Sequence, residues 1–130
     1  MEKAQRFIMK YYINSDLESV WHRIEKSSYV DGRDNMLSWL RIMESGQMYK
    51  VTQDIFEKLD NAENATEDEK LEDEKVFYKD LRDEHFRVPI LIKDSKGDMV
   101  ILYGNTHLEL MMKEEGSCRI WVMTRERWKE

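Results

Sequence analysis

The sequence has few of the residues that mark several common protein classes. Its 130 residues include one cysteine, Cys118, and one proline, Pro89. A single cysteine excludes an internal disulfide and a zinc site built from several cysteines. No apolar run approaches the roughly 20 residues that a membrane-spanning helix needs, and no segment resembles the apolar part of a signal peptide. We therefore predict a cytoplasmic protein that makes no membrane contact.

Basic residues are also outnumbered, with 21 Lys and Arg against 27 Asp and Glu, which gives a net charge of -6. This balance argues against direct binding to nucleic acid through broad contact with its phosphates. The length and the apolar content of 41% suit one domain with a sizeable core. We therefore predict a single domain over residues 1–130. The oligomeric state is left open.

The first half of the chain predicts one strand and then a group of helices. Residues 6–13 are dense in aromatic and branched side chains, which is typical of a strand. Apolar residues at helical intervals predict helices over about 16–26 and 34–46, and Thr52 can cap a third, shorter helix. The buried stripe of that third helix is predicted to be Ile55, Phe56 and Leu59. We expect the three helices to pack together.

Residues 60–75 form the most polar segment, and they allow two interpretations. In the first, a loop over 61–65 leads into a solvated helix that begins at Thr66, with Glu69 completing a capping box. In the second, an acidic face docks on a basic protein partner or mimics nucleic acid. The partner-binding residues would then be Glu67, Asp68, Glu69, Glu72, Asp73 and Glu74. In either case the helix should continue beyond residue 75, gain an apolar side in its later turns and end before Pro89.

The last third of the chain predicts a hairpin, a helix and a strand. Apolar runs at 88–92 and 99–103 flank a turn at 94–97, which is a β-hairpin pattern, and Pro89 marks either an edge strand or a strand entrance. Gly104 should end the second strand. Thr106 with Glu109 has capping-box spacing for a helix that runs to Glu115 and closes at Gly116.

A final strand over 119–123 should place Ile120 and Val122 on one face and Trp121 and Met123 on the other. Together these elements predict an α+β fold. Its small mixed sheet would hold the N-terminal strand, the hairpin and the C-terminal strand, packed with about four to five helices. The helical part would span about 15–86, and the hairpin, helix and strand core about 87–123.

The junction Gly104-Asn105-Thr106-His107 is the clearest candidate binding site. A glycine at a strand end allows close backbone approach, and the first turn of a helix presents free N–H groups at the positive end of its dipole. Thr106 and His107 would place a hydroxyl and an imidazole beside a bound anion. The alternative interpretation is structural: Gly104 turns the chain, Thr106 caps the helix and His107 is exposed.

The order V-P-I-L-I-x-D-x-x-G-x-x-x-x-x-x-G-N-T-x-L-x-x-x-x-x-x-x-G over 88–116 resembles the core of the ParB N-terminal and sulfiredoxin superfamily. In that family a hairpin leads to a short glycine motif at the start of a helix that holds nucleotide phosphates. The resemblance covers Val88 to Met123. It implies that Gly104, Asn105, Thr106 and His107 bind a nucleotide or other phosphate, with Mg²⁺ as a candidate cofactor.

Two departures from the family pattern limit that expectation. His107 stands where the family has a phosphate-binding arginine, and histidine is mostly neutral at pH 7. Tyr103 replaces an acid often found before the glycine in members with phosphotransfer activity. Cys118 lies away from the motif, which does not support sulfiredoxin-type thiol chemistry. Nucleotide binding is therefore expected to be weakened or lost, and catalytic residues are not assigned.

No other group of residues predicts a chemical site. His22, His85 and His107 have no metal-ligand spacing and are interpreted as surface histidines, so no metal site is predicted. Cys118 is interpreted as a small buried residue. Three functions stay open: a phosphate-binding ParB-like domain, active as an enzyme or not; a small acidic accessory or inhibitor protein of the phage type that binds another protein; and a DNA partition or regulatory module.

Overall fold

The computed structural model describes residues 17–27, 29–30, 34–83, 88–94 and 96–124. The elements in chain order are α2 (Leu17–Ile24), α3 (Met36–Glu44), β1 (Gln47–Val51), α4 (Gln53–Phe56), β2 (Asp60–Asn61), α5 (Glu67–Arg82), β3 (Ile90–Lys93), β4 (Met99–Tyr103), α6 (Asn105–Glu115) and β5 (Cys118–Thr124). The strand predicted over 6–13 lies outside the described residues.

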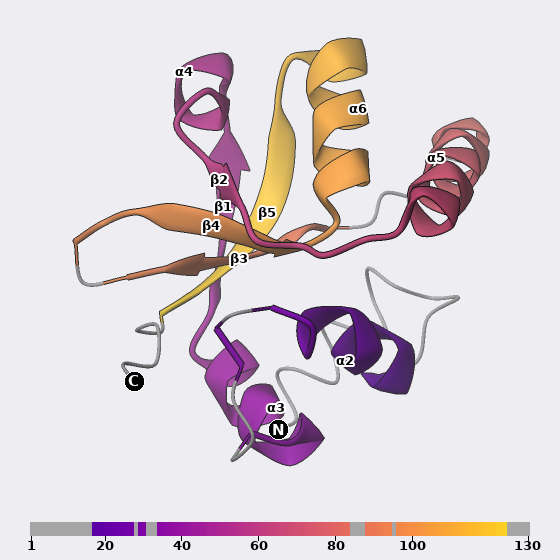
Figure 1. Cartoon of the computed structure of the whole chain (residues 1–130). Helices are drawn as coiled ribbons and strands as arrows, with labels where there is room; N and C mark the ends of the chain where they lie inside the picture. Colours follow the sequence, from indigo (N-terminus) through magenta and orange to yellow (C-terminus); the bar gives the residue numbers. More distant parts are fainter. Residues whose placement is uncertain (1–16, 28, 31–33, 84–87, 95, 125–130) are drawn as a thin grey trace.

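The five described strands form one mixed sheet in the order β1-β5-β3-β4-β2 (Figure 1). β3 and β4 are the predicted antiparallel hairpin, and β1 pairs antiparallel with β5. β3 runs parallel to β5, and the short β2 runs parallel to β4. The fold is therefore α+β with a small mixed sheet, as the sequence predicts.

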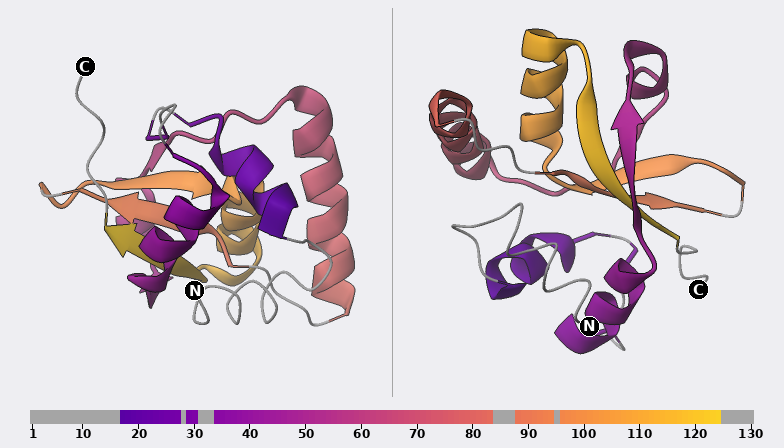
Figure 2. Two further views of the ribbon diagram at one scale, coloured as in Figure 1. Left: turned by 90° about the horizontal axis from the view of Figure 1, so that it is seen from below. Right: turned by 180° about the vertical axis from the view of Figure 1, so that it is seen from behind.

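Helices cover both faces of the sheet. α2 and α3 pack on one face, and α4, α5 and α6 lie on the other, as the views in Figures 1 and 2 agree. β3 contributes side chains to the hydrophobic core on both faces of the sheet. Ile90 and Ile92 face α2 and α3, while Leu91 faces α6. In β5 the predicted alternation is confirmed: Ile120 and Val122 face the α6 side, and Trp121 and Met123 face the other.

Several local predictions from the sequence are confirmed. Thr66 Oγ1 accepts the Glu69 N–H while the Glu69 carboxylate accepts the Thr66 N–H, so the capping box of α5 is present. Gly116 ends α6 with a φ of +74°. Pro89 marks a strand entrance and not an edge, because β3 lies between β5 and β4.

Other predictions are wrong in ways that matter for the site. β1 and β2 fall within the stretch predicted to be helical. α4 has four residues and none is buried; Ile55 is 36% exposed. It also lies across the sheet from α2 and α3, so the three helices do not pack together. β3 lies between β4 and β5, and because it is antiparallel to β4 and parallel to β5, the strands that flank α6 in the chain run antiparallel to each other. None of the described helices is long and apolar enough to span a membrane.

Candidate ligand-binding site

The predicted junction between β4 and α6 exists, but its helix begins earlier than expected. Gly104 is the N-cap of α6, with a φ of +88°, and provides no side-chain cap. A Cβ at this position would lie 3.0 Å from Pro89 Cα, which adds a packing reason for glycine. The prediction that Thr106 caps the helix is wrong, because α6 already begins at Asn105. Asn105 Nδ2 donates to Glu109 Oε1 at 3.1 Å.

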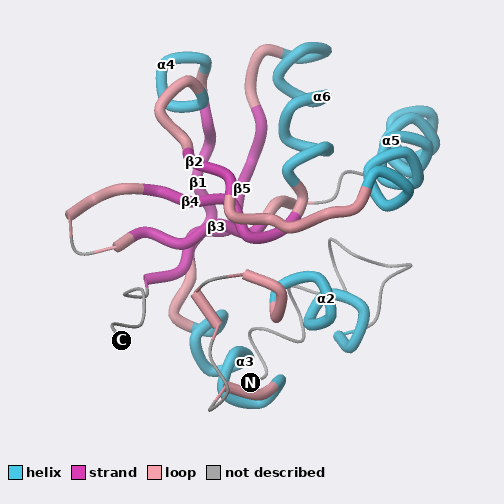
Figure 3. Tube along the Cα trace, viewed as in Figure 1, coloured by secondary structure: helices cyan, strands magenta, loops and turns pink. Residues whose placement is uncertain are grey.

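A carboxylate of the chain itself occupies the start of this helix. Glu63 belongs to the loop that runs from β2 beneath the first turn of α6 to α5 (Figure 3). Its Oε2 accepts the Gly104 N–H at 2.8 Å, and its side chain is 2% exposed. Burial raises the pKa of Glu63, and the N–H of Gly104 and the charge of Arg23 offset part of that rise. An anion from solution would have to displace Glu63 to reach the Gly104 N–H.

Arg23 of α2 balances the carboxylates around the junction. Its Nη2 lies 2.7 Å from Asp73 Oδ2 and 3.8 Å from Glu63 Oε2, and its Nε lies 3.3 Å from Glu69 Oε2. The guanidinium carbon lies 5.7 Å from the centre of the Tyr103 ring. Burial by itself lowers the pKa of Arg23, but the hydrogen bond and charge of Asp73 raise it overall, so this side chain stays protonated. Arg23 therefore ties α2 to α5 beside the junction.

His107 lies inside the molecule, between two hollows. It is 7% exposed, and its ring meets Phe77 edge-on with centroids 5.2 Å apart. The prediction of a surface histidine is wrong, because His107 lies one helical turn before the buried Met111 and packs against Phe77 of α5. On one side is a cavity of about 30 Å³ that His107 shares with Arg23, Glu63, Asp73 and Tyr103. This cavity is large enough for one or two waters only.

On the other side of His107 is a larger pocket, of about 340 Å³, between α6 and the adjoining ends of β5 and β1. We call it the α6 pocket. Val88 and Met111 supply apolar wall, while His107, Ser117 and Cys118 supply polar atoms. Burial raises the pKa of the Cys118 thiol to about 12, so it is protonated at neutral pH, and its predicted burial is confirmed.

Two basic residues from neighbouring strands are also on the lining of the α6 pocket. Lys50 of β1 lies directly opposite Arg119 of β5 in the antiparallel register. Like charges in directly opposed positions destabilise a sheet. Glu115, at the end of α6, is the one acid among the described residues of the lining. These described residues therefore give the α6 pocket an excess of one basic side chain, on a chain whose net charge is -6.

The structure divides the acidic residues that the sequence proposed for partner binding. Glu69 and Asp73 contact Arg23, and Glu69 also contacts Lys26. The N–H of Thr66, with the charge of Arg23, lowers the pKa of Glu69. The other four residues, Glu67, Asp68, Glu72 and Glu74, are exposed.

Metal binding receives no support from the described part of the chain, where no three His, Cys, Asp or Glu side chains are grouped to hold an ion. His22 is exposed and lies 3.0 Å from Glu25. His85 lies outside the described residues.

A scan against protein-family models and searches of curated proteins and of solved structures find no match to this chain. The resemblance to the ParB and sulfiredoxin superfamily therefore stays a prediction. We therefore infer function from the geometry of the junction and of the α6 pocket.

Of the four residues predicted at the junction, His107 alone lines the α6 pocket. Gly104 and His107 border the small cavity. Glu63, Lys50 and Arg119 were missed. Glu63 appeared as one more acid of a polar loop, and the two bases become neighbours only through the pairing of β1 with β5.

Proposed function

We propose that this protein binds a small phosphate-bearing molecule, of the nucleotide class, in the α6 pocket. The observation that carries the proposal is the opposition of Lys50 and Arg119 on the lining of that pocket. A doubly charged phosphate placed between them would accept charge-assisted hydrogen bonds from both. The proposed ligand belongs to the class predicted from the sequence, but the proposed binding residues are different.

The size and lining of the α6 pocket support a small ligand. Small-molecule pockets have volumes of roughly 300–1,000 Å³, and about 340 Å³ is near the lower end of that range. Val88 and Met111 suit an apolar or aromatic part of the ligand, such as a base, and His107 and Ser117 offer hydrogen bonds. A mononucleotide or a smaller phosphate ester fits this description better than a dinucleotide.

The junction between β4 and α6 is a weaker candidate for binding an external anion than the α6 pocket is. The Gly104 N–H is already bonded to Glu63, so the helix start contributes little to an external anion. Among the described residues, Lys50 and Arg119 are the Lys and Arg residues that line the α6 pocket together with His107.

Thermal shift measurements test the proposal with ATP, CTP, GTP, AMP, adenosine and inorganic phosphate as probes. We expect the nucleotides to raise the melting temperature and adenosine to have little effect. A ligand at 100 times its dissociation constant stabilises by about 2.7 kcal/mol. In the double variant Lys50→Ser/Arg119→Ser the shift should disappear.

Lys113→Ser is the matched control, because Lys113 is an exposed base of α6 that does not line the pocket. It should leave the shift intact. The proposal is wrong if no phosphate compound shifts the wild-type protein, or if the double variant responds as the wild type does.

A further inference from the structure

The outer side of α5 carries a row of side chains that has no role in the site above. The inner side of α5 buries Phe77 and Asp80 and holds Arg23 through Asp73. Residues on the opposite side recur at helical intervals, and we call this set the α5 stripe. Its members are Glu67, Leu71, Glu74, Lys75, Tyr78 and Arg82.

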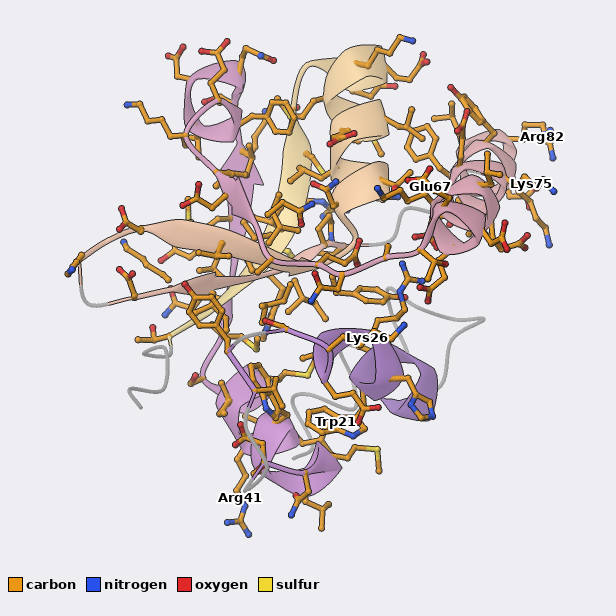
Figure 4. The ribbon with its side chains drawn as sticks, viewed as in Figure 1. Trp21, Lys26, Arg41, Glu67, Lys75 and Arg82 are labelled. Carbon is orange, nitrogen blue, oxygen red and sulfur yellow. The ribbon has the colours of Figure 1, made fainter. Side chains whose placement is uncertain are left out.

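All members of the α5 stripe except Tyr78 are exposed to solvent. Leu71 is 58% exposed, more than any other large apolar side chain in the described part of the chain. Glu67 is 88% exposed and lies 3.4 Å from Lys70, one turn along the helix. Lys75 and Arg82 extend from the side of α5 that faces away from α6 (Figure 4). Tyr78 is half-buried, with its ring edge-on to Phe77.

The stripe is complementary to itself when reversed. If a second α5 lies antiparallel to the first, about a two-fold axis between Glu74 and Lys75, each acid of the stripe meets a base. Glu67 of one copy then faces Arg82 of the other, and Glu74 faces Lys75. Leu71 faces Tyr78, so the apolar member meets the aromatic one. A parallel arrangement would instead set like charges together.

We propose that two copies of this chain associate through an antiparallel pair of α5 helices joined along the α5 stripe. The charges select this occupant over a basic partner, because a basic surface would match Glu67 and Glu74 but meet Lys75 and Arg82. A two-fold axis, which is the commonest symmetry of homodimers, also makes every contact occur twice.

The association is weak and depends on salt. A single pair of short helices buries less than the roughly 1,000 Å² expected of a stable interface. Exposed ion pairs contribute about 0–1 kcal/mol each and are screened by salt. The dimer should therefore form only at high protein concentration and dissociate as the ionic strength rises.

Sedimentation equilibrium tests the proposal through charge exchange. The weight-average mass of the wild-type protein should rise with concentration from 15.8 kDa toward twice that value. Glu67→Arg breaks two ion pairs in the dimer and creates two repulsions, so the dimerisation constant should fall roughly tenfold, equivalent to about 1.4 kcal/mol. Glu67→Arg/Arg82→Glu restores opposite charges and should restore the dimer.

The matched control is Glu72→Arg, which makes the same charge change on an exposed position of α5 outside the stripe. It should associate like the wild type, and circular dichroism should show that all variants keep their helix. A wild-type protein that remains monomeric at every concentration overturns the proposal. So does a Glu67→Arg variant that associates as well as the wild type.

A second measurement does not depend on charge. Lys75 lies next to the proposed axis, so Lys75→Cys should form a disulfide-linked dimer on mild oxidation. Glu72→Cys, displaced from the axis, should remain monomeric. The native Cys118 is buried and its pKa is raised to about 12, so it does not compete. Equal cross-linking of the two variants would also overturn the proposal.

Discussion

The carboxylate of Glu63 lies in a buried site, where burial disfavours its charged form. Its side chain is 2% exposed, and burial raises its pKa despite the Gly104 N–H and the nearby Arg23. Two further carboxylates, Glu69 and Asp73, share the same arginine. One guanidinium therefore serves three acids, which leaves Glu63 poorly compensated when it is ionised.

The raised pKa gives Glu63 a defined effect on the pH dependence of stability. The native state binds its proton more tightly than the unfolded state, so this group favours folding at pH values below its unfolded pKa. That contribution is lost as the pH rises through the native pKa. At neutral pH an ionised Glu63 lowers the free energy of unfolding.

Glu63→Gln should therefore make the protein more stable at pH 7 to 8, because glutamine is neutral and its amide oxygen can still accept the Gly104 N–H. The advantage over the wild type should shrink as the pH falls toward the unfolded pKa of about 4.3. Urea unfolding at several pH values measures both effects. Glu72→Gln, at an exposed carboxylate outside the α5 stripe, is the matched control. Greater stability of the wild type at pH 7 would mean that the contact with Arg23 outweighs burial.

At the scale of the elements, helix α5 and helix α6 begin in different ways. α5 begins with a reciprocal capping box between Thr66 and Glu69. α6 begins at a left-handed glycine, and Thr106 lies inside its first turn without capping it. Both threonines stand three residues before a glutamate in the sequence, so local spacing alone gave them the same role.

Thr66→Ala and Thr106→Ala should therefore have opposite outcomes. Loss of the cap at Thr66 should lower the free energy of unfolding by about 1 kcal/mol. Thr106→Ala removes no cap, and alanine is the better helix former by up to roughly 0.6 kcal/mol, so stability should hold or rise. Urea unfolding followed by circular dichroism at 222 nm, the helix band, compares them. Equal losses from both substitutions would contradict the assignment of Gly104 as the N-cap.

Elements with strong local patterns could be predicted, and those defined by their neighbours could not. The hairpin, α5 and β5 carry apolar runs, capping residues and turns within their own sequence. β1 has one buried residue, Val51, and its strand conformation depends on pairing with β5. β2 is two residues long and exists through its pairing with β4.

The candidate site shows the same limit. Gly104 and the strand-to-helix junction follow from nearby residues and could be located from the sequence. Glu63 lies 41 positions from Gly104, and the closeness of Lys50 to Arg119 depends on the order of strands in the sheet. The burial of His107 depends on the packing of α5 against α6, which brings Phe77 against its ring.

At the scale of the whole molecule, two apolar layers share one central strand. Leu91 and Ile92 are adjacent in β3, are both 0% exposed, and face opposite layers. The three described tryptophans, Trp21, Trp39 and Trp121, all lie in the layer of α2 and α3. The longest helices, α5 and α6, lie in the other layer. Tryptophan fluorescence therefore reports the side of α2 and α3, whereas circular dichroism reports the helices of both sides, with α5 and α6 the longest among those described.

Because β3 joins the layers, we expect them to unfold as one unit. Leu91→Ala removes side-chain volume on the α6 side and should cost about 2–5 kcal/mol. If the layers are coupled, its urea midpoint should fall equally by tryptophan fluorescence and by circular dichroism. A Trp128→Phe background confines the fluorescence to the three described tryptophans. Leu71→Ala, at a position 58% exposed, is the control at low protein concentration and should change stability by less than about 0.5 kcal/mol. Separate midpoints for Leu91→Ala would show that the α2 and α3 layer folds independently of β3.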